Sequence, residues 1–279
     1  MDRAQYGPWA FIAGGSEGVG ESFARRLAGA GINLVLAARR PEPLQALADD
    51  LRNRHGVEVR TVAVDLCAAD LAAQVKAATD GLEVGLLIYN AGSGNPIGNV
   101  DPERPIGDFL DRPISDTRSM ISLNIAGLTE LARHFGGPMR ERRRGGIIIV
   151  GSTACHAGTA HTLVYSAVKS FQFAFAEGLW YELRPYNVQV LGLILGAVRT
   201  PNVERTGMDM ATYHGAAEPE DVVTEAFEHL GAGPVHHAGG TGEFAQQMRA
   251  MPRDEAATRA ALGIETYFPS FAGRGGGPN

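Results

Sequence analysis

Tyr165 and Lys169 are the two residues of this chain whose types and spacing most directly indicate acid–base chemistry. Residues four apart on a helix project from the same face, so a phenol and an ammonium group at this spacing can address one bound molecule. Free tyrosine titrates near pH ~10, and a nearby cation can lower its pKa until the phenol serves as acid and base. Such a pair also arises by chance, as a half-buried aromatic residue and a solvated charge. Its meaning therefore depends on the rest of the chain.

A glycine-rich turn is the second chemical feature. Gly14, Gly18 and Gly20 follow a short apolar run and precede a segment with apolar residues at helical spacing. Glycines let the backbone approach a pyrophosphate, which then lies at the positive end of the following helix. Any tight turn between a strand and a helix also needs glycine, so the turn alone leaves nucleotide binding open.

A basic pair follows the second apolar run. Arg39 and Arg40 come directly after Ala38, and no carboxylate occurs before Glu42. An acidic residue at this position would bind both ribose hydroxyls, whereas guanidinium groups match a 2′-phosphate. The pattern favours NADP(H) as the cofactor and leaves NAD(H) open, because Glu17 in the glycine turn could oppose the added phosphate. Surface arginines between a strand and a helix are the alternative, more plausible for Arg40 than for Arg39.

Strand-like and helix-like segments alternate along most of the chain. This alternation predicts an α/β fold with a parallel sheet of about seven strands and helices on both faces, a single doubly wound domain of the Rossmann type. Such a sheet binds its ligand at the carboxyl ends of its strands. The expected strands are 9–14, 32–37, 57–64, 84–89, 146–150, 188–195 and 235–238. One expected helix follows the glycine turn. The others cover 41–55, about 68–79, 115–135, 163–183, a segment that begins at 218–221, 243–251 and 253–266. Gly136–Pro138 is expected to end the helix at 115–135.

Two segments lack a strong pattern and are expected to be functional loops. Residues 93–116 are rich in proline and glycine, with a short helix expected around Phe109, and residues 198–215 could form a lid. The expected domain covers 9–238 at its core, with a helical extension over 239–268 and a disordered tail over 269–279.

The joint order of several motifs resembles the short-chain dehydrogenase/reductase family over about 9–235. Ser152 lies thirteen residues before Tyr165, a separation typical of that family. Within the family, the segments 6–9 and 85–90 and the helix after Tyr165 are similar to the 17β-hydroxysteroid dehydrogenase and 3-ketoacyl reductase branch. The motifs are the glycine turn, Asp65, Asn90-Ala91-Gly92, Asn124, Ser152 and the Tyr165/Lys169 pair.

The resemblance implies a role for each catalytic residue. Tyr165 would exchange a proton with the carbonyl or alcohol oxygen, and Lys169 would lower its pKa and bond the nicotinamide ribose. Ser152 would hydrogen-bond the substrate oxygen, and Asn124 would hold a water in a proton relay to Lys169. Taken singly, Ser152 could instead cap a turn and Asn124 could be a polar core residue. The implied cofactor contacts are Gly14, Ser16, Glu17, Gly18, Val19, Gly20, Ala38, Arg39, Arg40, Asp65, Leu66, Asn90, Ala91, Gly92, Tyr165, Lys169, Gly196, Val198 and Thr200.

Three positions depart from the family pattern. Ala13 stands where threonine is usual, Leu195 replaces the proline before Gly196, and Val168 replaces a small or hydroxylic residue. The first departure removes a hydrogen bond that would brace the glycine turn. None of the three removes a catalytic group.

The substrate side is expected near residues 154–163. His156 or His161 could bind a polar substrate group, although a structurally bonded histidine is an equal alternative. Cys155 is expected to be a small apolar filler rather than a nucleophile. The expected wall comprises Ala154, Cys155, His156, His161, Leu163 and Val203, with Met208 nearby, and suits a hydrophobic or aromatic ketone or secondary alcohol.

The leading hypothesis is an NADP(H)-dependent oxidoreductase that interconverts a ketone and a secondary alcohol. A catalytically silent NADP-binding or redox-sensing protein of the same fold is the alternative. A serine hydrolase built on Ser152 ranks last, because no Gly-x-Ser-x-Gly elbow surrounds that serine.

Composition excludes several other classes. A net charge of -6 argues against a nucleic-acid groove, and the basic run 140–144 is expected to be a solvated helix end. No apolar run approaches the ~20 residues of a membrane span. Cys67 and Cys155 do not suggest a disulfide framework, so a cytoplasmic protein is expected. The resemblance implies a homodimer or homotetramer paired through the helices at 115–135 and 163–183.

Overall fold

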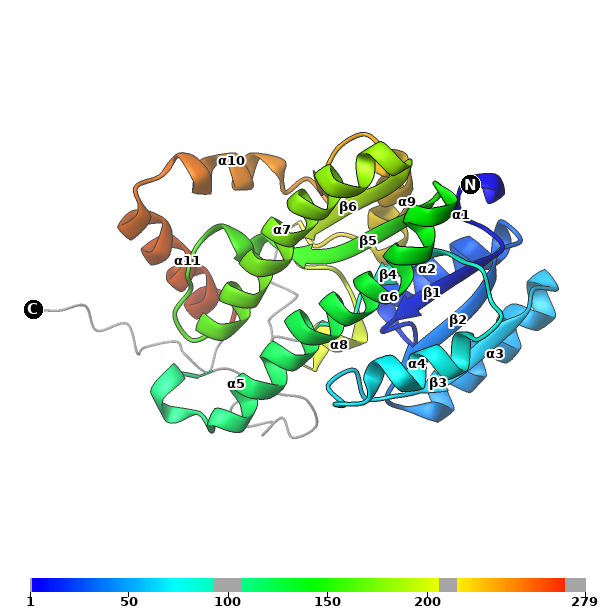
Figure 1. Ribbon diagram of the computed structural model, residues 1–279. Coiled ribbons are helices and arrows are strands. Elements are labelled where there is room, and N and C mark those ends of the chain that lie inside the picture. Colours follow the sequence, from blue (N-terminus) through cyan, green and yellow to red (C-terminus); the bar gives the residue numbers. More distant parts are fainter. Residues whose placement is uncertain (1, 93–106, 206–214, 269–279) are drawn as a thin grey trace, which may run out of the picture.

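A seven-stranded sheet forms the centre of the structure, a computed structural model that describes residues 2–92, 107–205 and 215–268 (Figure 1). The strand order is β3-β2-β1-β4-β5-β6-β7, and every neighbouring pair is parallel. The expected α/β fold with helices on both faces is confirmed. The strands are β1 (Trp9–Ala13), β2 (Asn33–Ala38), β3 (Val59–Ala63), β4 (Val84–Tyr89), β5 (Gly145–Ser152), β6 (Val188–Leu195) and β7 (Val235–His237).

The chain winds outward from β1 in both directions. β1 pairs with β2 on one side and with β4 on the other, so the connections leaving these strands diverge. In such a sheet the crevice at the carboxyl ends of the two diverging strands is the usual place for a ligand. The glycine turn and the segment Asn90–Gly92 therefore meet at one edge of the sheet.

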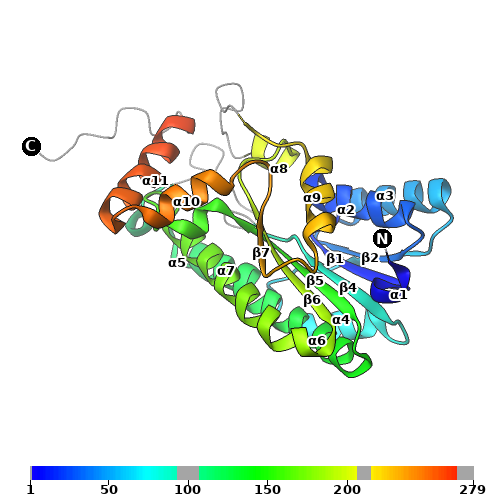
Figure 2. The same cartoon turned by 90° about the horizontal axis from the view of Figure 1, so that it is seen from above.

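Helices cover both faces of the sheet (Figure 2). Consecutive residues of β1 face opposite layers: Ala10 and Ile12 pack in one core, and Phe11 and Ala13 in the other. Burial on both faces explains why the strands read as apolar runs without alternation. One layer holds α2 (Gly18–Gly29), α3 (Pro41–His55) and α9 (Pro219–His229), and the other holds α4 (Leu71–Thr79), α6 (Gly127–Arg142) and α7 (Leu163–Leu183).

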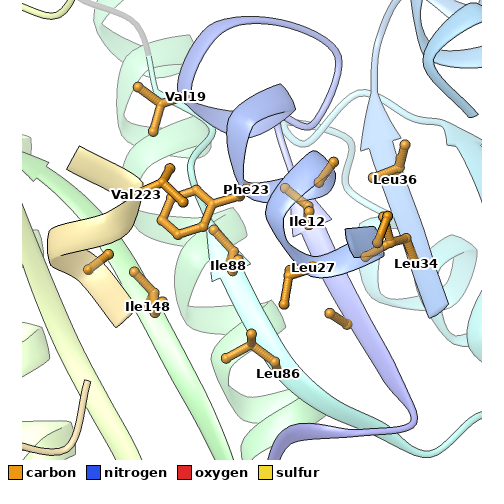
Figure 3. Close-up of a cluster of buried hydrophobic side chains, with 14 of the residues drawn as sticks. Ile12, Val19, Phe23, Leu27, Leu34, Leu36, Leu86, Ile88, Ile148 and Val223 are labelled. Atoms are coloured by element: carbon orange, nitrogen blue, oxygen red, sulfur yellow. The ribbon is translucent and has the colours of Figure 1, made fainter. Parts of the chain in front are cut away.

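The core under α2 fixes the helix that follows the glycine turn (Figure 3). Phe23 and Leu27, one helical turn apart, are fully buried in the same apolar cluster as Ile12 and Ile88 of the neighbouring strands. The ring of Phe23 also meets Phe227 of α9 edge-on, with 5.6 Å between ring centroids. Burial of each such side chain contributes about 1.5–3 kcal/mol, so the amino terminus of α2 is held firmly at the strand ends.

The expectation that Gly136–Pro138 end the long helix is wrong. The helix runs from α5 (Ile114–Ile121) through a π-helical segment (Ser122–Ala126) into α6, which continues to Arg142 with Pro138 inside it. Phe135 and Met139 lie one turn apart in the core facing the sheet, and this packing outweighs the helix-breaking tendency of Pro138. The helix ends where Arg143 adopts a left-handed conformation, with φ of 57°.

The basic run 140–144 is not simply a solvated helix end. Arg142 donates to the backbone carbonyl of Val84, and Arg143 donates to that of Pro185 at 2.8 Å. Arg144 forms an ion pair with Glu83 at 2.6 Å. These side chains bind the amino-terminal ends of the strands, which local sequence did not indicate.

Short elements and the carboxyl-terminal extension complete the fold. The short helix expected around Phe109 is a 3-10 helix (Phe109–Asp111), and residues 239–268 form α10 (Gly242–Ala250) and α11 (Arg253–Tyr267), as expected. None of the helices in the described part of the chain is long and apolar enough to cross a membrane. The tail at 269–279, Met208 and most of the two expected loops lie outside the described residues. The remaining elements are α1 (Arg3–Tyr6), α8 (Pro201–Glu204) and 3-10 turns at Thr153–His156 and Arg184–Tyr186.

Candidate active site

A cavity of about 730 Å³ lies at the carboxyl ends of the central strands. Its walls come from segments that are far apart in the sequence, as the position of a ligand crevice in this fold requires. The cavity brings together most of the residues that the sequence predicted for the site. These are Gly14, Ser16, Glu17, Gly18, Val19, Ala38, Arg39, Arg40, Asp65, Leu66, Asn90, Ala91, Gly92, Ser152, Tyr165, Lys169, Gly196, Val198, Thr200 and Val203.

Gly20, which does not line the cavity, is required by close packing beneath the glycine turn. A Cβ at Gly20 would lie 2.0 Å from the carbonyl oxygen of Gly14 and 2.8 Å from the side-chain nitrogen of Asn90. Gly14 and Gly18 have φ of 79° and 57°, a region that residues with side chains rarely adopt. The turn therefore presents bare backbone at the amino terminus of α2, which suits a pyrophosphate.

Asn90 braces the glycine turn from the end of β4. Its side-chain amide donates to the carbonyl of Gly14 at 2.8 Å. The turn thus has a brace although Ala13 carries no hydroxyl group. This contact links the two strands that flank the crevice.

Arginines and one carboxylate line the part of the cavity next to β2. Arg40 forms an ion pair with Glu17 at 2.7 Å, and Arg205, which follows α8, binds the same carboxylate. Partial burial opposes ionisation of Glu17, but the hydrogen bonds from Arg205 and Arg40 outweigh it and lower its pKa. Arg39 lines the cavity and forms no ion pair with any described residue. The three guanidinium groups of Arg39, Arg40 and Arg205 in one part of the cavity fit an anionic ligand such as a phosphate.

Tyr165 and Ser152 meet at the inner end of the cavity. Ser152 is the last residue of β5, and its hydroxyl oxygen accepts from the backbone nitrogen of Ala154 at 3.2 Å. Burial raises the pKa of Tyr165, and a hydrogen bond from Ser152 partly opposes this increase. The serine therefore caps a turn, which was the alternative, and also contacts the phenol. Its hydrogen bond to a substrate oxygen stays a prediction.

Lys169 is buried below Tyr165. Its ammonium group donates to the carbonyl of Val150 at 3.2 Å and to the side-chain oxygen of Gln172 at 2.8 Å, and it lies 5.6 Å from the centre of the Tyr165 ring. Burial lowers the pKa of Lys169 to about 8. Desolvation dominates the pKa of Tyr165 and the opposing hydrogen bond comes from Ser152, so the expected effect of Lys169 on the phenol stays a prediction.

Asn124 lies beside Lys169 but does not line the cavity. It is fully buried in the π-helical segment, and its side-chain amide donates to the carbonyl of Met120 at 2.9 Å. Its own backbone carbonyl accepts from the side chain of Gln172 at 3.0 Å. Where the resemblance implied a water between Asn124 and Lys169, the structure places the amide of Gln172.

The two histidines expected at the substrate wall do not line the cavity. Their side chains turn toward the carboxyl-terminal part of the chain. His156 is buried with its Nε2 atom 3.1 Å from that of His237. His161 bonds Asp108 at 2.7 Å and contacts Glu265 of α11 at 3.4 Å. The structurally bonded alternative is therefore the one that the structure supports.

Ala154, Cys155 and Leu163 also lie outside the cavity wall. Burial raises the pKa of Cys155 to about 12, which agrees with an inert filler. Leu163 is half exposed at the start of α7. A 3-10 turn (Thr153–His156) follows Ser152 and directs Ala154 and Cys155 away from the cavity. Closeness in sequence to Ser152 therefore did not predict a place in the cavity wall.

Sequence reasoning missed Arg205 and Gln172. Arg205 occurs in a segment without a pattern, and Gln172 belongs to an otherwise apolar helix stripe, so neither carried a local signal. The remaining cavity residues that were not predicted are Val64, Leu123, Val150, Gly151, Leu195 and Asn202.

Comparison with known proteins identifies relatives of this chain. Residues 8–211 match a family model described as short chain dehydrogenase. A 7β-hydroxysteroid dehydrogenase from Clostridium sardiniense is 30% identical over 238 residues, which cover 85% of this chain and 87% of the relative. A human very-long-chain 3-oxoacyl-CoA reductase is 30% identical over 208 residues, covering 71% of this chain and 64% of the relative. The family resemblance is thereby confirmed, and the relatives include both a hydroxysteroid dehydrogenase and a 3-oxoacyl-CoA reductase.

Solved structures show the same relationship. The structure of a 7β-hydroxysteroid dehydrogenase has a TM-score of 0.83 and 29% identity, covering 92% of this chain and 98% of its own. A short-chain dehydrogenase from Sphingobium yanoikuyae in complex with NADPH has a TM-score of 0.76 and 29% identity, covering 93% and 95% of the two chains.

Proposed function

The chain belongs to the short-chain dehydrogenase/reductase family of NAD(P)-dependent oxidoreductases, and we propose that it interconverts a bulky apolar ketone and the corresponding secondary alcohol with NADP(H). One observation carries this proposal. Tyr165, Ser152 and Lys169 line the same cavity as the glycine turn and the ends of the central strands. A cofactor lying along the turn would therefore end beside a proton donor.

Tyr165, Ser152 and the cofactor each have a separate role in the proposed reaction. A bound nicotinamide cofactor supplies the hydride that reaches the carbonyl carbon. Tyr165 donates its phenolic proton to the carbonyl oxygen, and its raised pKa keeps that proton in place at neutral pH. The single hydroxyl proton of Ser152, which contacts the phenol in the free protein, would donate to the developing alkoxide and stabilise the charge that forms on the oxygen. Alcohol oxidation reverses these steps and requires the phenolate.

The arginine wall supports NADP(H) over NAD(H). Arg39, Arg40 and Arg205 line the cavity near the end of β2, where a dinucleotide places its adenosine ribose. The bare backbone of the glycine turn at Gly14 and Gly18 and these guanidinium groups together fit a dinucleotide with a 2′-phosphate. Asp65 lines the same cavity, and we expect it to contact the adenine.

Apolar residues near Tyr165 support a hydrophobic substrate. Leu123, Leu195 and Val203 line the cavity together with the phenol. A relative with 30% identity is a 7β-hydroxysteroid dehydrogenase. A fused-ring or similarly bulky ketone is therefore the first substrate class to test.

A panel of ketones followed through NADPH absorbance tests the proposal. It should contain ketosteroids that differ in carbonyl position, a 3-ketoacyl thioester, aryl ketones and a small aliphatic ketone. Turnover that favours the bulky apolar ketones is expected. NADPH binding without turnover on any member would instead support the silent nucleotide-binding alternative.

We also propose a homodimer or homotetramer. Ile114 and Ile121 of α5 are 57% and 42% exposed, and Leu163 of α7 is 50% exposed, so these helices present apolar side chains to the surface. Such residues suit an interface between copies of the chain.

We further propose one domain over residues 9–238 with its extension at 239–268. Both cysteines are free, which suits the reducing cytoplasm.

A further inference from the structure

Gln172 forms a buried bridge behind the catalytic residues. It follows Tyr165 and Lys169 on one stripe of α7, at positions i, i+4 and i+7. The residue is 1% exposed, although glutamine is a polar side chain that seldom lies in a core. Its side-chain oxygen accepts from Lys169 at 2.8 Å, and its side-chain nitrogen donates to the backbone carbonyl of Asn124 at 3.0 Å.

The chemistry of the two partners fixes the orientation of this amide. The ammonium group of Lys169 can only donate, so it requires the oxygen of Gln172. The backbone carbonyl of Asn124 can only accept, so it requires the nitrogen. A flipped amide would lose both hydrogen bonds inside a buried site, where each unpaired polar group costs free energy. Gln172 therefore fits between these two partners in one orientation.

An amide bridge and a water bridge differ in one property. A water molecule between Lys169 and Asn124 could accept one proton and release another, whereas an amide N–H does not release its proton at neutral pH. The contact between Gln172 and Lys169 can thus hold the ammonium group and favour its charged form. It cannot carry a proton from Lys169 toward Asn124.

We propose that Gln172 is a positioning residue that holds the ammonium group of Lys169 in place of a bridging water and closes the proton path behind it. The inference rests on the proposed function, because it assigns Lys169 a part in the same site. It follows that the proton of Tyr165 is replaced from the cavity side, through Ser152 or bulk solvent, and not through Asn124.

Two substitutions separate this role from simple space filling. Gln172→Leu keeps most of the volume but offers no acceptor, so Lys169 loses a hydrogen bond and water stays out. Gln172→Ala opens a polar space bounded by Lys169 and by the carbonyls of Val150 and Asn124, where a water has enough partners to bind. We expect kcat for ketone reduction to fall about 100-fold in Gln172→Leu and less than about fivefold in Gln172→Ala. A space-filling role predicts the opposite order, because Gln172→Ala would leave the larger cavity.

NADPH affinity measured by fluorescence across a pH series gives a readout that does not depend on turnover. Lys169 has a pKa of about 8, so affinity should decline near that pH in the unaltered protein. The decline should move to lower pH in Gln172→Leu and stay nearly unchanged in Gln172→Ala. The isosteric Gln172→Glu keeps an acceptor and adds negative charge, so the decline should move to higher pH.

The outcomes distinguish this inference from the proposed function. If no ketone is reduced by the unaltered protein, the proposed function fails, but the pH series still tests Gln172. Opposite shifts in Gln172→Leu and Gln172→Glu support the inference. An unshifted profile in both variants, or a smaller loss of kcat in Gln172→Leu than in Gln172→Ala, would overturn it. Thermal unfolding of each variant shows whether it is folded. If Gln172→Leu does not fold, the pH profile of Gln172→Glu alone tests the inference.

Discussion

The carboxylate of Glu17 in the glycine turn forms an ion pair with the guanidinium group of Arg205, which lies 188 residues further along the chain. Arg40 binds the same carboxylate from the end of β2. Glu17, which could oppose a 2′-phosphate, is thus already paired with Arg40 and Arg205, two of the arginines that we propose bind the phosphate. We therefore expect cofactor selection to be a competition between Glu17 and the 2′-phosphate.

Glu17→Gln should strengthen NADPH binding and leave NADH binding nearly unchanged. The amide removes a negative charge from the arginine wall and frees Arg40 and Arg205 for the phosphate. These groups are partly exposed, and solvent screens them, so we expect a three- to tenfold decrease in the Kd for NADPH, or about 1 kcal/mol. Fluorescence titration with both cofactors measures the effect. Equal changes for NADPH and NADH would contradict the competition.

Arg39→Ala should act in the opposite direction. Arg39 lines the cavity and is not engaged by a carboxylate in the described part of the chain. Loss of a charge-assisted hydrogen bond to phosphate should raise the Kd for NADPH about tenfold with little effect on NADH. Arg54→Ala on the exposed side of α3 is the control and should change neither value. An equal loss for both cofactors in Arg39→Ala would refute the assignment of a 2′-phosphate site.

The direction of the reaction should depend on pH. The pKa of Lys169 is about 8 because burial disfavours its charged form, so the cation is present below that pH and is lost above it. The Lys169 cation is expected to bond the nicotinamide ribose, so kcat/KM for ketone reduction should decline above about pH 8, by up to about tenfold per pH unit. Alcohol oxidation needs the phenolate of Tyr165, whose raised pKa makes that form scarce, so its rate should increase with pH. Reduction that stays constant well above pH 8 would contradict a pKa of about 8 for Lys169.

Ile121→Glu should disrupt the proposed oligomer. Ile121 ends α5 and is 42% exposed, so in an interface the new carboxylate would be buried without a partner. Light scattering after size exclusion should show a smaller species. Leu262→Glu on α11, where leucine is 56% exposed, is the matched control and should leave the mass unchanged. A monomeric unaltered protein would remove the proposal altogether.

The strands of the parallel sheet and the glycine turn were predictable because they depend on local patterns. Apolar runs, the glycines at 14, 18 and 20, and the polar residues after each strand all follow from rules that act over a few residues. Tyr165 was predictable from its spacing to Lys169, and Ser152 from the family resemblance and its place at the end of a strand. The cavity then brings them together.

The features that escaped prediction depend on packing between distant segments. The helix passes through Pro138 because Phe135 and Met139 are buried on the sheet. Arg205 reaches Glu17 and Gln172 reaches Asn124 only once the chain has folded. A single arginine or glutamine has no sequence signature for such a contact. For the same reason, His156 was expected at the wall although it packs against His237.

Replacement of Tyr165 by phenylalanine tests the central claim most directly. The change removes one oxygen atom at the point where the phenol meets Ser152 and leaves the glycine turn intact. Tyr181→Phe, at an exposed position on the same helix, is the control and should behave like the unaltered protein. We expect Tyr165→Phe to bind NADPH normally and to reduce the best ketone of the panel at least about 1,000-fold more slowly. Ketone reduction at an undiminished rate in Tyr165→Phe would contradict the account.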